Sequence, residues 1–212
     1  MSITIIHPMP SLETYLDRFT TPRLMADRIT LAHFGLLEFV RRYSPMDPDE
    51  RRSCDAFVPL LDATADPFAG TQMRPGHVTA NACVVSRTDR RILLIRHPTL
   101  GRWMQPGGHL EAGDSDLAAA AVRAAAEETG LSPIAPSRLP FDLDVHAIPA
   151  EAGTPAHAHY DVRFLAVVDG LPVATTAERI EWRWFAPSEL APLGLGPSVL
   201  RMVEKARMAG LL

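Results

Sequence analysis

The sequence predicts an α/β protein in which helices pack on a mixed β-sheet, with a helical extension before it. Three observations support this fold class. Strand-like segments rich in Val, Ile and Leu lie on both sides of one alanine-rich helical segment, 117–129. An amphipathic helical segment closes the chain at 198–208. The N-terminal 75 residues read as helices followed by a linker. Strands that flank a central helix imply helices on a mixed sheet.

The N-terminal part, residues 1–75, is expected to hold three helices and a Pro- and Gly-containing linker that starts at residue 64. The helices are predicted at 11–19, 24–43 and 49–63, and Pro59 disturbs the third. No catalytic constellation occurs in this part. We interpret its helices as packing elements or as the contact of a homodimer, and the alternative is a cap that shapes the substrate site.

The second part, residues 76–212, is expected to form the main domain. The apolar run 92–95 predicts a strand that is buried on both faces. A short helical turn is expected at 187–190, before the closing helix. The predicted strands are His77–Ser86, Arg91–His97, Phe141–Ile148, Asp161–Val168 and Glu181–Phe185.

Composition excludes several classes of protein. Of the 212 residues, 47% are hydrophobic and 22% charged, which is ordinary for a globular chain. The net charge of −4, without any block of five like charges, argues against a nucleic-acid partner bound through a basic face. Two cysteines make neither a metal motif nor a disulfide framework. No signal peptide or membrane span is evident, so we expect a cytoplasmic protein.

One stretch, residues 107–131, organises the second part. It consists of a glycine turn, an acidic loop and the alanine-rich helix, which ends in paired glutamates. Ser115 or Asp114 is the expected N-cap, and Asp116 is expected in the first turn. Gly130 follows the helix as a C-cap glycine should.

This stretch resembles the Nudix box of the Nudix hydrolases. The family pattern is Gly, five residues, Glu, seven residues, Arg-Glu, an apolar residue, any residue, Glu-Glu, any residue, Gly and an apolar residue. Two departures occur: eight residues instead of seven precede the arginine, and Ala124 replaces the glutamate that should follow it. The matching positions are Gly108, Asp114 (in place of the first Glu), Arg123, Glu127, Glu128, Gly130 and Leu131.

The resemblance covers about His77 to Ala209 and implies a Nudix-like α/β/α sandwich with a mixed sheet. It also implies a hydrolase that uses Mg²⁺ or Mn²⁺ as Lewis acid and activator of water. Glu127, Glu128 and Arg123 then form the catalytic set, in which Arg123 holds the loop on the helix through Asp114 or Glu127. The predicted metal ligands are Glu127, Glu128 and the Gly108 carbonyl, as the resemblance implies, together with Glu111 as a replacement ligand from the loop.

Ala124 bears directly on activity, because the family's glutamate at this position is normally a metal ligand or a catalytic base. Fewer carboxylates weaken metal binding. Three outcomes fit: Glu111 replaces the missing ligand, a residue of another loop serves as base, or the domain binds its ligand without turnover.

Histidines form a second candidate feature. His157 and His159 share one face if their segment is extended, His146 lies on another predicted strand, and His109 lies in the glycine loop. Neutral imidazoles can contact phosphate, relay protons or bind a transition metal. The alternative is surface histidines without a role. We predict substrate contacts by Arg102, His109, His157 and His159, whereas Trp103 is expected to pack.

Three functions compete. The leading hypothesis is a divalent-metal-dependent hydrolase of a nucleoside diphosphate derivative or similar small phosphoanhydride. The second is a catalytically weak Nudix domain that binds a nucleotide-like ligand as a sensor. The third is an assembly role of the N-terminal helices. The substrate is a small molecule in the first two, and its identity does not follow from the sequence.

Overall fold

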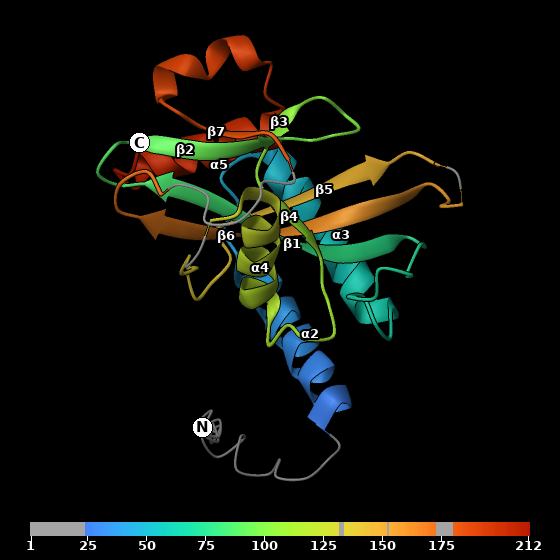
Figure 1. Cartoon of the computed structure of the whole chain (residues 1–212). Coiled ribbons are helices and arrows are strands. Elements are labelled where there is room, and N and C mark those ends of the chain that lie inside the picture. The colour runs from blue at the N-terminus through green and yellow to red at the C-terminus, as the bar shows by residue number, and fades with distance from the viewer. Residues whose placement is uncertain (1–23, 132–133, 152, 173–179) are drawn as a thin grey trace, which may run out of the picture.

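The computed structural model describes residues 24–131, 134–151, 153–172 and 180–212 (Figure 1). The helix predicted at 11–19 lies outside this range. The helices are α2 (Leu24–Arg42), α3 (Pro48–Ala63), α4 (Leu117–Thr129) and α5 (Pro197–Met208), with 3₁₀ turns at Pro187–Glu189 and Ala191–Leu193. The strands are β1 (Gly76–Ser86), β2 (Arg91–Arg96), β3 (Trp103–Met104), β4 (Gly107–His109), β5 (Asp142–Ile148), β6 (His157–Val168) and β7 (Trp182–Phe185).

The seven strands of the described residues form one mixed sheet, and a mixed sheet is what the sequence predicts. The main path runs β3-β2-β1-β6-β5, while β4 pairs with β1 and β7 with β2. The long strands β1 and β6 are parallel over their whole shared length, and the other pairs are antiparallel. The run Ile92–Ile95 of β2 is buried throughout, which confirms the expected burial on both faces.

Two hydrophobic cores lie on the two faces of the sheet. One joins the alanines of α4 and the apolar side chains of α2 and α3 to β1 and β6 residues such as Val78 and Val162. The other joins α5 to β1 and β2 residues such as Val85 and Leu94. The structure is therefore a helix–sheet–helix sandwich, and Figure 1 shows α4 and α5 at different sides of the strands.

The helices α2 and α3 are joined to the sheet by polar contacts as well as by the shared core. Glu50 of α3 is fully buried. It accepts hydrogen bonds from the Tyr43 hydroxyl at 2.6 Å and from the Leu143 backbone N–H at 3.3 Å, and it also pairs with Lys205 of α5. Lys205 in turn contacts Asp142 of β5 at 2.9 Å. This junction connects the N-terminal helices to both the sheet and the C-terminal helix.

Several local expectations need correction. The N-cap of α4 is Asp116, not Ser115 or Asp114, because the Asp116 carboxylate accepts from the Ala119 N–H at 2.8 Å. Asp114 is instead held by Arg123, at 2.8 Å. Strand β6 begins four residues before the predicted Asp161, and the short strands β3 and β4 were not expected.

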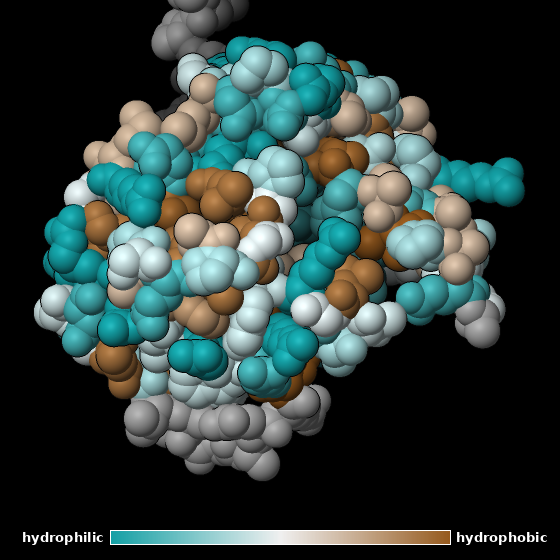
Figure 2. Space-filling model, turned by 90° about the horizontal axis from the view of Figure 1, so that it is seen from above, coloured by the Kyte–Doolittle hydropathy of each residue, from teal (hydrophilic) through white to brown (hydrophobic). Residues whose placement is uncertain are grey.

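The surface mixes apolar and polar residues. Large exposed hydrophobic side chains come from separate elements, for example Phe34 on α2, Leu139 in a loop and Met208 at the end of α5. On the face shown in Figure 2, hydrophobic residues occur in groups interrupted by hydrophilic ones. Scattered apolar exposure of this kind is normal for folded proteins. None of the described helices combines the length and hydropathy that crossing a bilayer requires.

Candidate functional site

Helix α4 presents the paired glutamates of the predicted site. Its alanine-rich interior buries Ala120, Ala121 and Ala125 against the sheet, which brings the helix close to the strands. At its C-terminal end Gly130 adopts the left-handed conformation, with φ of 70°, and stops the helix directly after the glutamates. The short alanine side chains and the end of the helix at Gly130 together determine the positions of Glu127 and Glu128.

Arg123 fastens the acidic loop to α4. Its Nε and Nη2 atoms donate to the two carboxylate oxygens of Asp114, at 2.8 and 2.9 Å. Its Nη1 atom donates to Glu111 and to Glu127, both at 3.1 Å. Nη2 also donates to the His109 carbonyl at 2.9 Å. The guanidinium thus holds three carboxylates and the end of β4 together, as the pairing predicted for Arg123 requires.

Glu128 lies in a different environment from its neighbour. Its Oε2 atom accepts from the Gly107 backbone N–H of β4 at 2.9 Å, and no cationic side chain among the described residues pairs with it. Burial raises the pKa of Glu128 to about 7, because the Gly107 hydrogen bond lowers it only in part and the charge of Glu127 raises it further. A carboxyl with such a pKa is suited to cation binding or proton transfer near neutral pH.

Ala124 lies between α4 and β4, where the family pattern has a glutamate. Its side chain is 5% exposed. A Cβ on Gly108 would lie 3.7 Å from the Ala124 Cβ atom, so helix and strand are in close contact here. The third carboxylate of the pattern is replaced by an apolar contact.

The other implied metal ligand, Glu111, lies in the acidic loop with its side chain 62% exposed. Beside this loop is a cavity of about 260 Å³, and its walls include Phe68 and Ala32 from the N-terminal part. The N-terminal part therefore reaches the loop that Arg123 holds. The same part also packs on the sheet, since α2 and α3 belong to its hydrophobic core.

Five histidines gather on one face of the sheet. The register places His77 of β1 opposite His159 of β6, and His159 opposite His146 of β5. His109 of β4 and His157 of β6 join them. Ring centres are 4.8 Å apart for His77–His159, 5.2 Å for His109–His159 and 5.7 Å for His146–His159. The sequence indicated His157 and His159 on one face, and the structure adds His77 to them.

The histidine cluster faces away from α4. In β1, Val78 and Ala80 belong to the core that contains the α4 alanines. Adjacent residues of a strand point to opposite faces of the sheet, so His77 points away from α4. Gly108 of β4 faces Ala124, so His109 points away from the helix as well. The glutamates of α4 and the imidazoles are thus two separate features around β1 and β4.

A row of buried polar residues continues from the histidines along β1, β6 and β5. Thr79 donates to Asp161 at 2.6 Å, and Gln105 donates to the same carboxylate at 3.3 Å. Arg163, only 2% exposed, contacts Asp161 at 3.1 Å and Asp142 at 3.1 Å. No site role was predicted for these residues, although polar and apolar residues alternate along β5 and β6 in the sequence.

Arg102 and Trp103 lie at β3 and are not part of the histidine cluster. Arg102 is exposed just before β3, a strand that pairs with β2 rather than with β1 or β4. Trp103 packs edge-on against Phe185 of β7, with ring centres 4.9 Å apart, as expected for a packed side chain. The structure therefore groups His109, His157 and His159 but does not bring Arg102 to them.

The fold is a helix–sheet–helix sandwich. Its candidate site consists of the glycine strand β4, the acidic loop held by Arg123 and the paired glutamates of α4. The chain belongs to the NUDIX domain family, whose model matches residues 75–205. The match includes the site, the histidine cluster and most of α5, while α2 and α3 precede it.

Curated relatives include the protein named phosphatase NudJ of Escherichia coli strain K12. It is 38% identical over 96 residues, which cover 39% of this chain and 61% of that protein. The same values apply to phosphatase NudJ of Shigella flexneri. The match therefore spans about three fifths of the length of these relatives.

Solved structures with similar folds include the NUDIX domain of Shewanella oneidensis NrtR in complex with ADP ribose. It is 20% identical with a TM-score of 0.46, and the match covers 81% of this chain and 96% of that one. A Caenorhabditis elegans Ap4A hydrolase binary complex is 18% identical with a TM-score of 0.48, covering 63% and 98%. Similarities at this level do not bear on function.

Proposed function

We propose that the protein hydrolyses a phosphoanhydride bond in a nucleoside diphosphate derivative or a similar small molecule, with a divalent cation held at the paired glutamates. The observation that supports this most directly is Glu128. It is a carboxyl at the end of the box helix, with a pKa of about 7, bound to a glycine N–H and unpaired with any cationic side chain that the structure describes.

The donor set fits Mg²⁺ or Mn²⁺. Magnesium prefers hard oxygen ligands and is commonly held by one or two carboxylates together with waters and substrate phosphates. Glu128 supplies a shielded carboxylate, and Glu127 beside it supplies a half-exposed one. The cation would relieve the like-charge contact between the two glutamates, and it would supply Lewis-acid activation and charge neutralisation at the phosphates.

The chain's own residues have distinct roles in this proposal. Without the cation Glu128 holds a proton near neutral pH, and it releases that proton when the cation binds. Glu127 and Glu111 are oriented by the same Nη1 atom of Arg123, which keeps both carboxylates close to the loop. Arg123 is a positioning residue, since its donors are occupied by these carboxylates, by Asp114 and by the His109 carbonyl. Glu111 is the carboxylate that can compensate for Ala124.

Ala124 favours one alternative, a domain that binds a nucleotide-like ligand with weak or no turnover. The buried alanine leaves α4 with two box carboxylates, and no group of three converging ligand atoms among the described residues includes them. A site with fewer anionic ligands binds a cation more weakly. The two functions differ in turnover, and a single set of measurements separates them.

The experiment is a screen of nucleoside triphosphates, sugar nucleotides, ADP-ribose and dinucleotide polyphosphates with Mg²⁺ or Mn²⁺. We expect hydrolysis of at least one class, and a loss of about 10²-fold or more in Glu128→Gln, because the variant removes a carboxylate ligand of the cation. Glu204→Gln is the matched control, because Glu204 is an exposed residue of α5 that pairs with Arg207.

The outcomes are distinct. Turnover that disappears in Glu128→Gln and persists in Glu204→Gln supports the hydrolase. Ligand binding by calorimetry without turnover, unchanged in Glu128→Gln, supports the sensor function. Turnover that is equal in wild type and Glu128→Gln shows that the paired glutamates are not the reaction site.

A further inference from the structure

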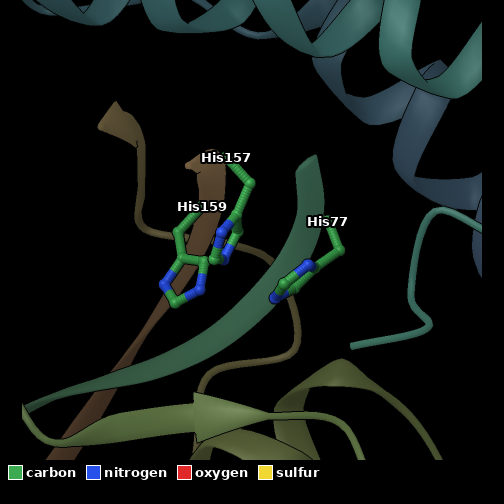
Figure 3. A group of neighbouring side chains, drawn as sticks. All are labelled: His77, His157 and His159. Carbon is green, nitrogen blue, oxygen red and sulfur yellow. The ribbon is translucent and has the colours of Figure 1, made fainter. Parts of the chain in front are cut away.

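His77, His157 and His159 lie around one space on the face of the sheet opposite α4. Figure 3 shows His77 extending from β1 and the other two from β6, with the three rings turned toward one another. Their nearest ligand nitrogens all lie within 4.8 Å of one another. Ring centres are 5.1 Å apart for His77–His157 and for His157–His159. Three imidazoles therefore converge from two neighbouring strands.

His77 is held with one nitrogen directed into this space. Its Nδ1 atom lies 3.0 Å from the Gln72 carbonyl, which is an acceptor only, so Nδ1 carries the proton. Nε2 is then a lone-pair acceptor. The residue is 1% exposed, and Nε2 is buried without a hydrogen-bond partner among the described residues. A buried unpartnered acceptor is costly and calls for a ligand.

His157 repeats the arrangement. Its Nδ1 atom lies 2.8 Å from the Pro155 carbonyl, so Nδ1 again donates and Nε2 carries the lone pair. An imidazole whose Nδ1–H is bound to a backbone carbonyl is the form in which histidine ligates metals, because the outer hydrogen bond fixes both tautomer and ring orientation. Two of the three rings are thus already oriented by their backbone contacts.

We propose that His77, His157 and His159 form a transition-metal site of the Zn²⁺ class, separate from the carboxylate site of α4. Imidazole nitrogen suits zinc and its neighbours in the first transition row, whereas Mg²⁺ prefers oxygen. Around a tetrahedral ion with bonds of about 2.0–2.1 Å, ligand nitrogens lie roughly 3.3 Å apart. Metal binding would require these nitrogens, now within 4.8 Å of one another, to approach by at most roughly 1.5 Å.

Three protein ligands leave a fourth position for water or for a ligand atom, as in zinc sites that act on substrates. The neighbours of the cluster are His109, whose ring centre lies 4.9 Å from that of His77, and the pair His146 and Asp161. This site does not depend on the proposed phosphoanhydride hydrolysis, since no residue of α4 contributes to it.

The test uses the full chain, stripped with a chelator and titrated with Zn²⁺ against a chromogenic competitor, and with Co²⁺ followed by visible absorption. We expect one tight Zn²⁺ site per chain, distinct from the weaker divalent-cation site proposed at the α4 carboxylates. X-ray absorption at the zinc edge should show three imidazole nitrogens. His157→Gln and His159→Gln should each weaken Zn²⁺ binding by at least about 10-fold, the smallest loss seen for mutation of a ligand's outer partner.

Two control variants make the result specific. His97→Gln removes a histidine of the β2–β3 connection that lies outside the cluster, and Glu128→Gln removes a box carboxylate. Both should keep the tight Zn²⁺ site with wild-type affinity. The proposal is overturned if the wild type binds no Zn²⁺ at micromolar concentration, or if His157→Gln and His159→Gln bind it unchanged. Equal loss in Glu128→Gln would instead assign the metal to the α4 site.

Discussion

Replacement of Arg123 by alanine tests the interpretation that this residue holds the acidic loop on α4. Arg123 makes two hydrogen bonds to Asp114, whose side chain is only 6% exposed, so the substitution leaves a shielded carboxylate without its cation. Hydrogen bonds to charged groups contribute about 1.5–3 kcal/mol. The bonds to Glu111 and Glu127 add little, because these side chains are 62% and 46% exposed.

We therefore expect Arg123→Ala to lower the free energy of unfolding by about 2–3 kcal/mol. For a chain of this length that corresponds to a decrease in Tm of roughly 4–12 °C. Arg123→Lys should be nearly as destabilising, since an ammonium cannot reproduce the two-pronged contact with Asp114. Arg207→Ala is the matched control, because its contact with Glu204 is 3.6 Å long and exposed, and it should change stability by less than about 0.5 kcal/mol.

The pH dependence gives a second measurement of the same contact. Burial raises the pKa of Asp114, but the hydrogen bonds from Arg123 and the Glu111 N–H, together with the Arg123 charge, outweigh it and lower the pKa. A lowered pKa in the folded state stabilises the protein above the unfolded pKa, and that stabilisation is lost as pH falls through the folded pKa. The difference between wild type and Arg123→Ala should be full at pH 7 and shrink below about pH 4.

Urea unfolding followed by circular dichroism, at a series of pH values, measures both quantities. The interpretation is refuted if Arg123→Ala costs no more than Arg207→Ala at pH 7. It is also refuted if the difference between wild type and variant does not change with pH, because the Asp114 contact would then not be its source.

Three further predictions follow from other contacts. Mg²⁺ affinity by calorimetry should rise about tenfold from pH 6 to pH 8, since Glu128 with a pKa of about 7 must lose its proton to bind a cation; a profile equally steep in Glu128→Gln contradicts this. Glu50→Gln should destabilise by about 3 kcal/mol, because it weakens a fully buried pair with Lys205, whereas the exposed Glu38→Gln should have almost no effect. Ala124→Glu should lower Tm in the absence of metal, because it buries a carboxylate, and Mg²⁺ should restore part of the loss; no response to Mg²⁺ would show that the position does not face the cation.

Local sequence patterns predicted the described helices and most strands well, because the formation of these elements depends largely on neighbouring residues. The bounds of α4 agree with the expected 117–129, and Gly130 ends it as expected. The short strand β4 was missed because only its pairing with β1 makes Gly107–His109 extended. Asp116 replaced the expected N-cap because Arg123, nine residues along the chain from Asp114, binds that carboxylate.

The candidate site was predicted only in part, because some of its contacts are local in the sequence and others join distant segments. Pairing of Arg123 with Asp114 or Glu127 was predicted, the latter from helical spacing, and the structure shows both contacts. His157 and His159 share a strand, so their parity was legible in the sequence. The place of His77 beside them depends on the parallel pairing of β1 with β6, strands between which residues 87–156 intervene. Register over such a separation is set by the whole fold and not by any local pattern.

The junction of Glu50, Lys205 and Asp142 has a practical consequence. The family match begins at residue 75, and a truncation designed from it would remove α2 and α3. It would uncover sheet residues such as Val78 and Val162 and leave Lys205 with one carboxylate fewer. The family match covers residues 75–205, whereas the shared core also includes α2 and α3. Expression trials, tags and crystallisation boundaries should follow the physical unit and keep the helices that precede the match.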